Sequence, residues 1–148
     1  MGRILGIDYG LKRTGLAVTD PLKIIAGGLE TVATEELENW LERYLARETV
    51  ERIVVGCPTM LNGSKSETLT RYVLPFVNKL KNKFPDTIID TFDERFTSKM
   101  AVDAMLCGGI KKKERRDKSK IDKLSATILL QGYLEKLKNE MIRKHNIF

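Results

Sequence analysis

The run Arg52-Ile53-Val54-Val55-Gly56 restricts the architecture of this 148-residue chain more than any other segment. Its three central residues are all aliphatic, which is typical of a strand that is buried on both faces. A helical pattern follows this run, and a second strand is predicted over Thr87–Phe92. Because a strand, a helix and a further strand in this order usually pair in parallel, we expect parallel strands covered by helices.

The segment before this unit has the pattern of antiparallel strands. Strands are predicted over residues 3–9, 15–19 and 24–32, with the first two joined as a hairpin. Gly27-Gly28 predicts a bulge in the third strand, because glycine weakens regular strand pairing. Three antiparallel strands followed by alternating helices and strands predict an α/β fold. We expect a five-stranded mixed sheet with helices on both faces.

Four helices are predicted. The first begins at Thr34 as its N-cap, and the second begins at the capping box Ser64-x-x-Glu67 and is interrupted by Pro75. The third covers residues 98–106, and the last covers residues 119–137. The residues expected to face the core from the first two helices are Leu37, Trp40, Leu41, Tyr44, Leu45, Leu69, Tyr72, Val73, Phe76 and Leu80.

The length of the chain predicts one domain with one hydrophobic core. We assign residues 1–138 to this domain and residues 139–148 to a polar C-terminal tail. Cys57 and Cys107 lie far apart and form no CxxC pair, so neither a zinc site nor a disulfide framework is expected. No apolar run approaches membrane-spanning length, and we expect a cytoplasmic protein that does not bind a membrane.

The net charge of +6 is concentrated in one short segment. Residues 111–120 carry seven basic and two acidic side chains, a net charge of +5, so the remainder of the chain is close to neutral. This pattern favours a local nucleic-acid contact, with a charged, solvated loop as the alternative. The basic residues are Lys111, Lys112, Lys113, Arg115, Arg116, Lys118 and Lys120.

Three acids occupy positions from which they can converge on one edge of a mixed sheet. Asp8 lies in the apolar first strand, Glu94 follows the strand ending at Phe92, and Asp122 lies at the start of the last helix. Hard oxygen ligands in this number suit Mg²⁺ or Mn²⁺, and a pair of such ions can catalyse phosphodiester hydrolysis.

Each acid also has a simpler interpretation. Asp8 could end a strand facing water, and Glu94 could form a surface ion pair with Arg95. Asp122 could be a helix-capping acid, since the helix dipole favours an acid in the first turn.

Three further cations lie close to these acids in the sequence. Lys12 and Arg13 follow the Asp8 strand and could bind a phosphate, although a polar hairpin turn explains them equally well. Arg95 could bind a phosphate or orient Glu94, and the sequence leaves both roles open.

Four motifs in order resemble the YqgF-type, or RuvX-like, proteins of bacteria over nearly the whole chain. They are Gly6-Ile7-Asp8-Tyr9-Gly10-x-Lys12-Arg13-x-Gly15, Val54-Val55-Gly56-x-Pro58 with Asn62-Gly63-Ser64, Asp93-Glu94-Arg95-x-Thr97, and Lys118-Ser119-Lys120-Ile121-Asp122. The resemblance implies a ribonuclease H-like fold and a divalent-metal nuclease site at Asp8, Glu94 and Asp122. It further implies processing of the 5′ end of the 16S ribosomal RNA precursor, with Holliday junction resolution as the alternative.

Two residues depart from the related patterns. Ser125 stands where RuvC-type resolvases carry a fourth acid, which favours RNA processing over junction resolution. Cys57 replaces an aliphatic residue before Pro58 but touches no expected ligand.

Other functions compete with the nuclease. Asp8-x-Gly10 also resembles the first phosphate loop of actin-like ATPases, which need a second domain, and a non-catalytic RNA-binding module is a further alternative. We expect precursor ribosomal RNA or branched DNA as the partner, with ribosomal particles as further candidates. A monomer and a homodimer are both compatible with the sequence.

Overall fold

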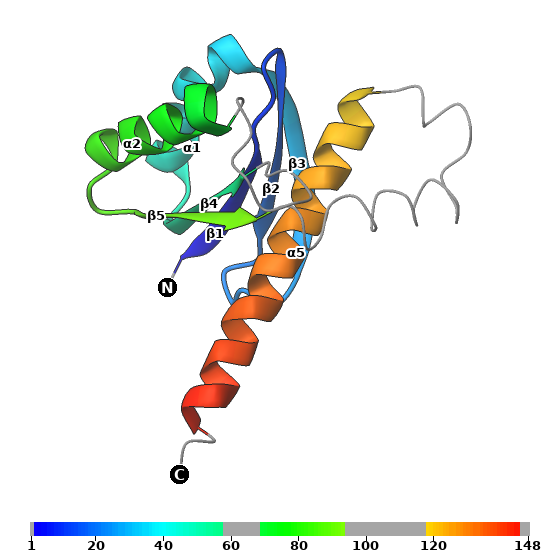
Figure 1. The fold of residues 1–148 in the computed structure, drawn as a ribbon, viewed down its shortest axis with the longest axis vertical. Helices are drawn as coiled ribbons and strands as arrows, with labels where there is room; N and C mark the ends of the chain where they lie inside the picture. Colours follow the sequence, from blue (N-terminus) through cyan, green and yellow to red (C-terminus); the bar gives the residue numbers. More distant parts are fainter. Residues whose placement is uncertain (1, 58–68, 94–117, 146–148) are drawn as a thin grey trace.

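The fold is a five-stranded mixed sheet with helices on both faces (Figure 1). The computed structural model describes residues 2–57, 69–93 and 118–145, without the side chains of residues 69–70, 118–121 and 145. The strands are β1 (Arg3–Asp8), β2 (Arg13–Thr19), β3 (Ala26–Ala33), β4 (Val50–Cys57) and β5 (Ile88–Asp93). The helices are η1 (Thr34–Glu36), α1 (Leu37–Arg47), η2 (Leu69–Val73), α2 (Leu74–Lys83) and α5 (Lys118–His145).

The strand order β3-β2-β1-β4-β5 confirms the predicted topology. β1 pairs antiparallel with β2, and β2 pairs antiparallel with β3. β1 pairs parallel with β4, and β4 pairs parallel with β5, as the buried run at residues 52–56 predicted. The two parallel pairings bring the C-terminal ends of β1, β4 and β5 to one edge of the sheet.

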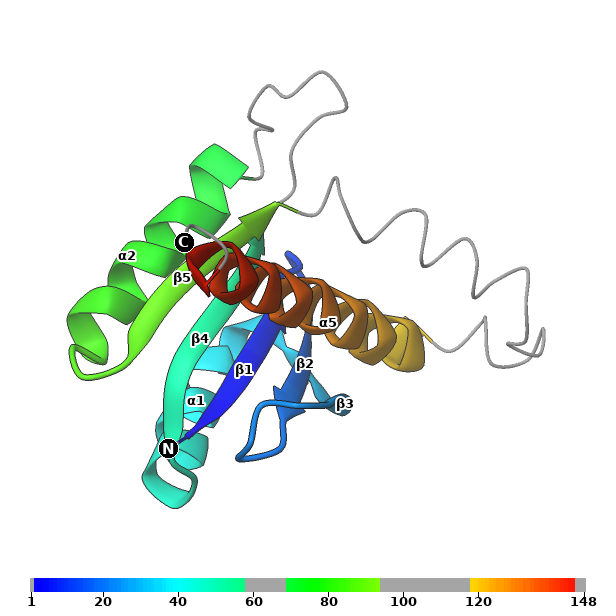
Figure 2. The same ribbon diagram turned by 90° about the horizontal axis from the view of Figure 1, so that it is seen from below.

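Two hydrophobic cores form, one on each face of the sheet. Leu5 and Ile7 of β1 point to the face covered by α1 and α2. Ile4 points to the opposite face, where α5 packs across the strands. Figure 2 shows α5 on one side of the sheet and α1 on the other. The alternation of side chains along β1 therefore decides which of its residues face α5.

Thr34 does not cap a helix as predicted. Residues 34–36 form a single 3-10 turn that has no side-chain cap, and α1 begins at Leu37. The Thr34 hydroxyl instead donates a hydrogen bond to the Gly10 carbonyl at 2.6 Å and bonds the Thr14 hydroxyl at 2.9 Å. The Thr34 hydroxyl therefore bonds residues at the β1–β2 turn and is not available to cap the helix.

The interruption predicted at Pro75 is confirmed. Residues 69–73 are π-helical, and α2 begins at Leu74 with the proline in its first turn, so the helix changes type just before Pro75. Tyr72 was predicted to be buried, but 38% of it is exposed. A π-helical turn has a wider repeat than an α-helix, so the predicted α-helical face does not extend back to Tyr72. The capping box at residues 64–67 and the helix predicted over residues 98–106 lie outside the described residues.

The predicted bulge in β3 is confirmed, and the last helix is longer than expected. β2 pairs Leu16 with Glu30 and Ala17 with Gly28, which leaves Leu29 as the extra residue. α5 continues past Leu137 to His145, and its final turns extend beyond the sheet (Figure 1). Within the described parts of the chain, no helix combines the length and apolar character needed to cross a bilayer.

Candidate functional site

Asp8 is the last residue of β1, and its side chain is half-buried. Alternation along the strand places it on the same face as Ile4, the face that α5 covers. Its antiparallel partner on β2 is Gly15. The chain fold therefore brings an acid from the N-terminal strand under the first turns of the C-terminal helix.

Asp122 lies in those first turns, and the structure brings it to the same place. Adding a Cβ atom to Gly15 would put that atom only 2.0 Å from the carbonyl oxygen of Asp122. The Asp122 carboxylate accepts a hydrogen bond from Nε of Arg13 at 2.9 Å. Asp8 and Asp122 thus both lie next to Gly15.

Two further glycines let α5 lie close to the sheet. A Cβ atom on Gly6 would lie 3.1 Å from Cβ of Leu130, and one on Gly28 would lie 3.3 Å from the hydroxyl of Thr127. Gly6, Gly15 and Gly28 thus let α5 lie close to β1, β2 and β3, respectively. The sequence did not identify this role, although a glycine within a strand is a general sign of close backbone approach.

The third predicted acid, Glu94, lies outside the described residues. Its neighbour Asp93 is the last residue of β5 and pairs with Cys57 at the end of β4. The strand ends at Asp8, Cys57 and Asp93 therefore share the edge of the sheet where Asp122 is found. Among residues 2–57, 69–93 and 118–145, no three His, Cys, Asp or Glu side chains form a group that could hold a metal ion.

The predicted phosphate-binding residues are described only in part. Lys12 is exposed in the turn before β2, and Arg13 pairs with Asp122. Lys118 and Lys120 belong to the first turn of α5, but their side chains are not described. The predicted residues outside the described ranges are Arg95, Lys111, Lys112, Lys113, Arg115 and Arg116.

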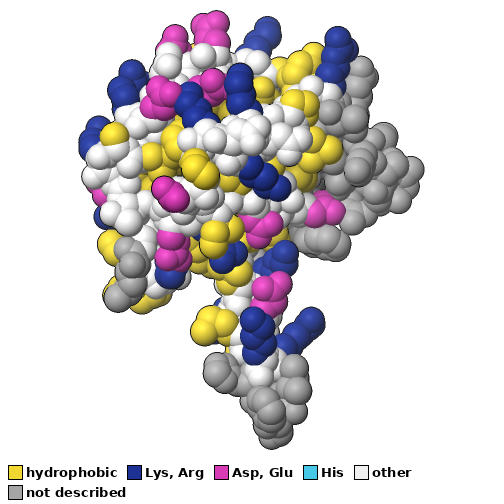
Figure 3. All heavy atoms as spheres, turned by 90° about the vertical axis from the view of Figure 1, so that its left-hand side faces the viewer, with side chains coloured by type: hydrophobic (Ala, Val, Ile, Leu, Met, Phe, Trp, Pro, Cys, Tyr) yellow, Lys and Arg dark blue, Asp and Glu magenta, His cyan; other side chains and the backbone are white. Residues whose placement is uncertain are grey.

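Charges of both signs alternate on the side of the molecule that carries α1 and α2 (Figure 3). Lys79 contacts Glu38 at 2.8 Å, and Lys83 forms an ion pair with Glu42. Among the residues that the structure describes, this face therefore has no continuous basic surface of the kind that binds a nucleic-acid backbone.

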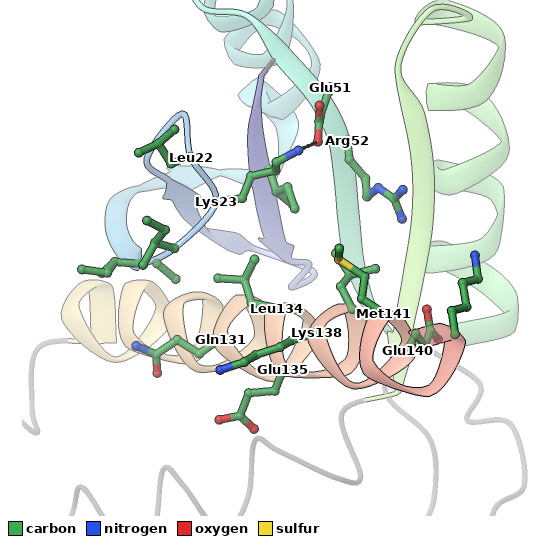
Figure 4. A pocket seen from close by; sticks show the side chains of 16 residues that line it. Leu22, Lys23, Glu51, Arg52, Gln131, Leu134, Glu135, Lys138, Glu140 and Met141 are labelled. Atoms are coloured by element: carbon green, nitrogen blue, oxygen red, sulfur yellow. Dashed lines mark hydrogen bonds and ion pairs between the residues drawn. The ribbon is translucent and has the colours of Figure 1, made fainter. Parts of the chain in front are cut away.

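A large cavity among the described residues lies far from the two acids. It has a volume of about 1010 Å³ and lies between the β2–β3 loop and the far end of α5 (Figure 4). Ile4 at the start of β1, Arg52 at the start of β4 and Met141 near the end of α5 line it. Since Asp8 ends β1 and Asp122 begins α5, the cavity and the acids lie at opposite ends of these elements.

A buried tyrosine fixes the position of α5 against β4 and β5. Tyr133 is completely buried, accepts a hydrogen bond from Arg52 at 2.6 Å and donates one to Asp90 at 2.7 Å. Its ring packs edge-on against Phe92. Burial and the hydrogen bond to Asp90 raise the pKa of Tyr133 to about 12, although Arg52 opposes this shift. Sequence analysis missed this network, because a single tyrosine in an amphipathic helix has no distinctive pattern.

Replacing Tyr133 by Phe tests the contribution of this hydroxyl. We expect the free energy of unfolding to fall by about 1 kcal/mol, since Arg52 and Asp90 lose a partner but remain partly solvated. Chemical denaturation of the two proteins measures the difference, and the replacement Tyr72→Phe at an exposed position is the control. A Tyr133→Phe protein as stable as the original would show that the hydroxyl contributes nothing.

Comparison with known proteins assigns the family. Residues 2–136 match the RuvX family, which is described as Holliday junction resolvase. The chain belongs to the RuvX family. A RuvX-type relative from Phocaeicola vulgatus, named "Putative pre-16S rRNA nuclease", is 54% identical over 93% of this chain and 99% of its own length. A relative of the same name from Porphyromonas gingivalis is 56% identical over 91% of this chain and 97% of its own length.

Solved structures with low sequence identity share the fold of this RuvX chain. The Fowlpox virus resolvase in complex with Holliday junction DNA has a TM-score of 0.58 at 15% identity, covering 91% of this chain and 98% of the resolvase. Thermus thermophilus RuvC in complex with a Holliday junction has a TM-score of 0.56 at 17% identity, covering 93% and 97%. The predicted ribonuclease H-like fold and the predicted family are thereby confirmed. As a RuvX nuclease, the chain is a hydrolase of phosphodiester bonds.

Proposed function

We propose that this RuvX protein is a divalent-metal-dependent nuclease that processes the 5′ end of the 16S ribosomal RNA precursor. Asp8 and Asp122 on either side of Gly15 carry this proposal, because two acids from opposite ends of the chain meet at one sheet edge. The names of relatives at 54% and 56% identity favour precursor ribosomal RNA as the substrate. The protein would act in the cytoplasm, where ribosomal RNA precursors occur, either alone or on ribosomal particles.

We assign the metal ligands to Asp8, Glu94 and Asp122. All three supply carboxylate oxygens, the donors that Mg²⁺ and Mn²⁺ prefer. Asp8 is half-buried, a position where a bound cation would stabilise the ionised carboxylate. Glu94 is the residue that follows Asp93, and Asp93 ends β5 at this edge of the sheet. When bound, one or two divalent ions would activate the attacking water and stabilise the leaving oxygen.

The chain itself would hold the substrate through basic side chains. Arg13 has five N–H donors in its guanidinium group, of which Nε–H is used on Asp122. The remaining donors can reach a phosphate oxygen, and exposed Lys12 adds a second positive charge beside it. The basic residues between Lys111 and Lys120 would add further contacts to the nucleic-acid backbone. Such contacts provide affinity without base recognition.

Holliday junction resolution is the second candidate, favoured by the description of the RuvX family. Against it, Ser125 lies half-buried one turn after Asp122 and supplies only a hydroxyl. A fourth carboxylate at this position would strengthen a second metal site. A resolvase would also need a symmetric dimer to cut two strands, whereas RNA processing can use a monomer. In both cases we assign the activity to one domain over residues 1–138.

A substrate comparison tests the proposal. The purified protein is incubated with precursor 16S RNA and with a four-way DNA junction, in Mg²⁺ and in excess chelator. We expect Mg²⁺-dependent cleavage of the RNA at least about tenfold faster than that of the junction, which corresponds to about 1.4 kcal/mol of discrimination. Faster cutting of the junction would favour resolution. Binding of RNA without cleavage of either substrate would favour the non-catalytic module.

A further inference from the structure

Arg13 is placed to contact Asp122 by a rigid turn. A Cβ atom on Gly10 would lie 2.2 Å from the carbonyl oxygen of Arg13, so the β1–β2 turn is tight and needs glycine there. Thr34 holds the same turn through two hydrogen bonds. Its amide donates to the Lys12 carbonyl at 3.0 Å, and its hydroxyl donates to the Gly10 carbonyl. The backbone of Arg13 is therefore held in place, while its guanidinium can move.

The guanidinium occupies an atom that the proposed metal ion would need. Nε of Arg13 lies 2.9 Å from Oδ2 of Asp122, with 24% of the Asp122 side chain and 42% of the Arg13 side chain exposed. A divalent ion on this carboxylate would lie close to a permanent positive charge and would lose one coordinating lone pair to the hydrogen bond. Cation binding and the Arg13–Asp122 pair therefore oppose each other.

We propose that Arg13 competes with the divalent ion for Asp122 and that a nucleic-acid phosphate relieves this competition. A phosphate attracts the guanidinium more strongly than an exposed carboxylate does, since it offers several oxygens for paired hydrogen bonds. Moving Arg13 onto the phosphate frees Oδ2 of Asp122. Metal loading is then coupled to substrate binding. This inference depends on the proposed function, specifically on Asp122 being a metal ligand.

Thermodynamic linkage makes the coupling measurable without following cleavage. If a phosphate backbone tightens metal binding, the metal must tighten backbone binding by the same factor. The Arg13→Gln replacement removes the competing charge, so it should tighten metal binding in the free protein. It should also abolish the additional tightening that nucleic acid causes. Arg43→Gln is the matched control, because it removes the same charge from an exposed position on α1, on the face of the sheet opposite to α5.

The experiment measures Mn²⁺ binding to the full-length protein by electron paramagnetic resonance, with and without a non-cleavable phosphorothioate RNA. We expect Arg13→Gln to bind Mn²⁺ about three to five times more tightly than the original, as loss of an exposed ion pair allows. We expect RNA to tighten Mn²⁺ binding at least about fivefold in the original and in Arg43→Gln, but not in Arg13→Gln. Thermal melting verifies that each variant is folded.

The same measurement on Asp122→Asn tests the proposed metal site separately from the proposed competition by Arg13. If Mn²⁺ binds this variant as well as it binds the original protein, Asp122 is no ligand and the proposed metal site fails. If Asp122→Asn loses Mn²⁺ but Arg13→Gln behaves like the original, the metal site stands and the competition by Arg13 is refuted. Equal RNA-induced tightening in Arg13→Gln and in the original would refute the coupling.

Discussion

Replacing Asp8 by Asn should nearly abolish cleavage while leaving RNA binding almost unchanged. The amide preserves the size of a half-buried side chain but removes the charge that a divalent ion requires. A metal ion contributes several kcal/mol to stabilising the transition state, so we expect a rate at least about 10³-fold lower. Single-turnover cleavage in Mg²⁺ measures the rate, and a filter-binding titration in chelator measures RNA affinity.

Asp86→Asn provides the control for loss of one negative charge. Asp86 is exposed in the turn before β5, at the end of that strand remote from Asp8. Its replacement should leave cleavage unchanged. Cleavage by Asp8→Asn within about a factor of ten of the original rate would contradict the assignment of Asp8, because less than about 1.4 kcal/mol would then depend on its charge.

Gly15→Ala should be the most damaging single replacement that removes no functional group. The new methyl carbon would lie 2.0 Å from the Asp122 carbonyl oxygen, so the start of α5 must move away from β2. We expect a fall in cleavage rate of about 10²-fold, since displacement of a catalytic group by about 1 Å has effects of that size. Overpacking at this contact should also lower the free energy of unfolding by about 1–3 kcal/mol.

Gly27→Ala is a matched control for this replacement. A Cβ atom on Gly27 meets nothing within 4 Å, so alanine there should be tolerated. Cleavage is compared well below the melting temperatures of both variants, so that unfolding does not contribute to the difference. A folded Gly15→Ala protein with the original cleavage rate would show that the distance between β2 and α5 does not control the site.

The sequence predicted the sheet because its signals are local. The aliphatic run at residues 52–56 indicated a buried strand, and the structure confirms its parallel pairing with β1 and β5. Gly27-Gly28 likewise indicated a bulge, which the structure places at Leu29. Hydrophobic periodicity and glycine placement depend on near neighbours in the chain, so they can be interpreted without knowledge of tertiary contacts.

The failed prediction at Thr34 and the network missed at Tyr133 both concern side chains whose partners are distant in sequence. Thr34 has the chemistry of an N-cap, but its hydroxyl bonds Gly10 and Thr14. Tyr133 resembled any other core residue of the last helix, yet it links Arg52 and Asp90. Such choices depend on which groups tertiary folding brings within hydrogen-bonding distance. Local sequence patterns contain no information about those distances.

The candidate site was only partly accessible to sequence reasoning. Asp8 and Asp122 could be selected because an acid in an apolar strand and an acid at a helix start are both visible in the sequence. The ion pair between Arg13 and Asp122 could not be foreseen, because Arg13 served equally well as a turn residue or a phosphate ligand. Gly15 was part of a recognised motif, but the sequence did not show that it allows α5 to lie close to β2.

The contact between Arg13 and Asp122 joins residues 109 positions apart. During synthesis, the chain therefore contains Asp8 long before it contains Asp122. Docking of α5 on β2 must wait until the last part of the chain has been released from the ribosomal tunnel. A translation product that stops before Asp122 therefore contains only one of the two acids, and under the proposed assignment it would lack the metal site.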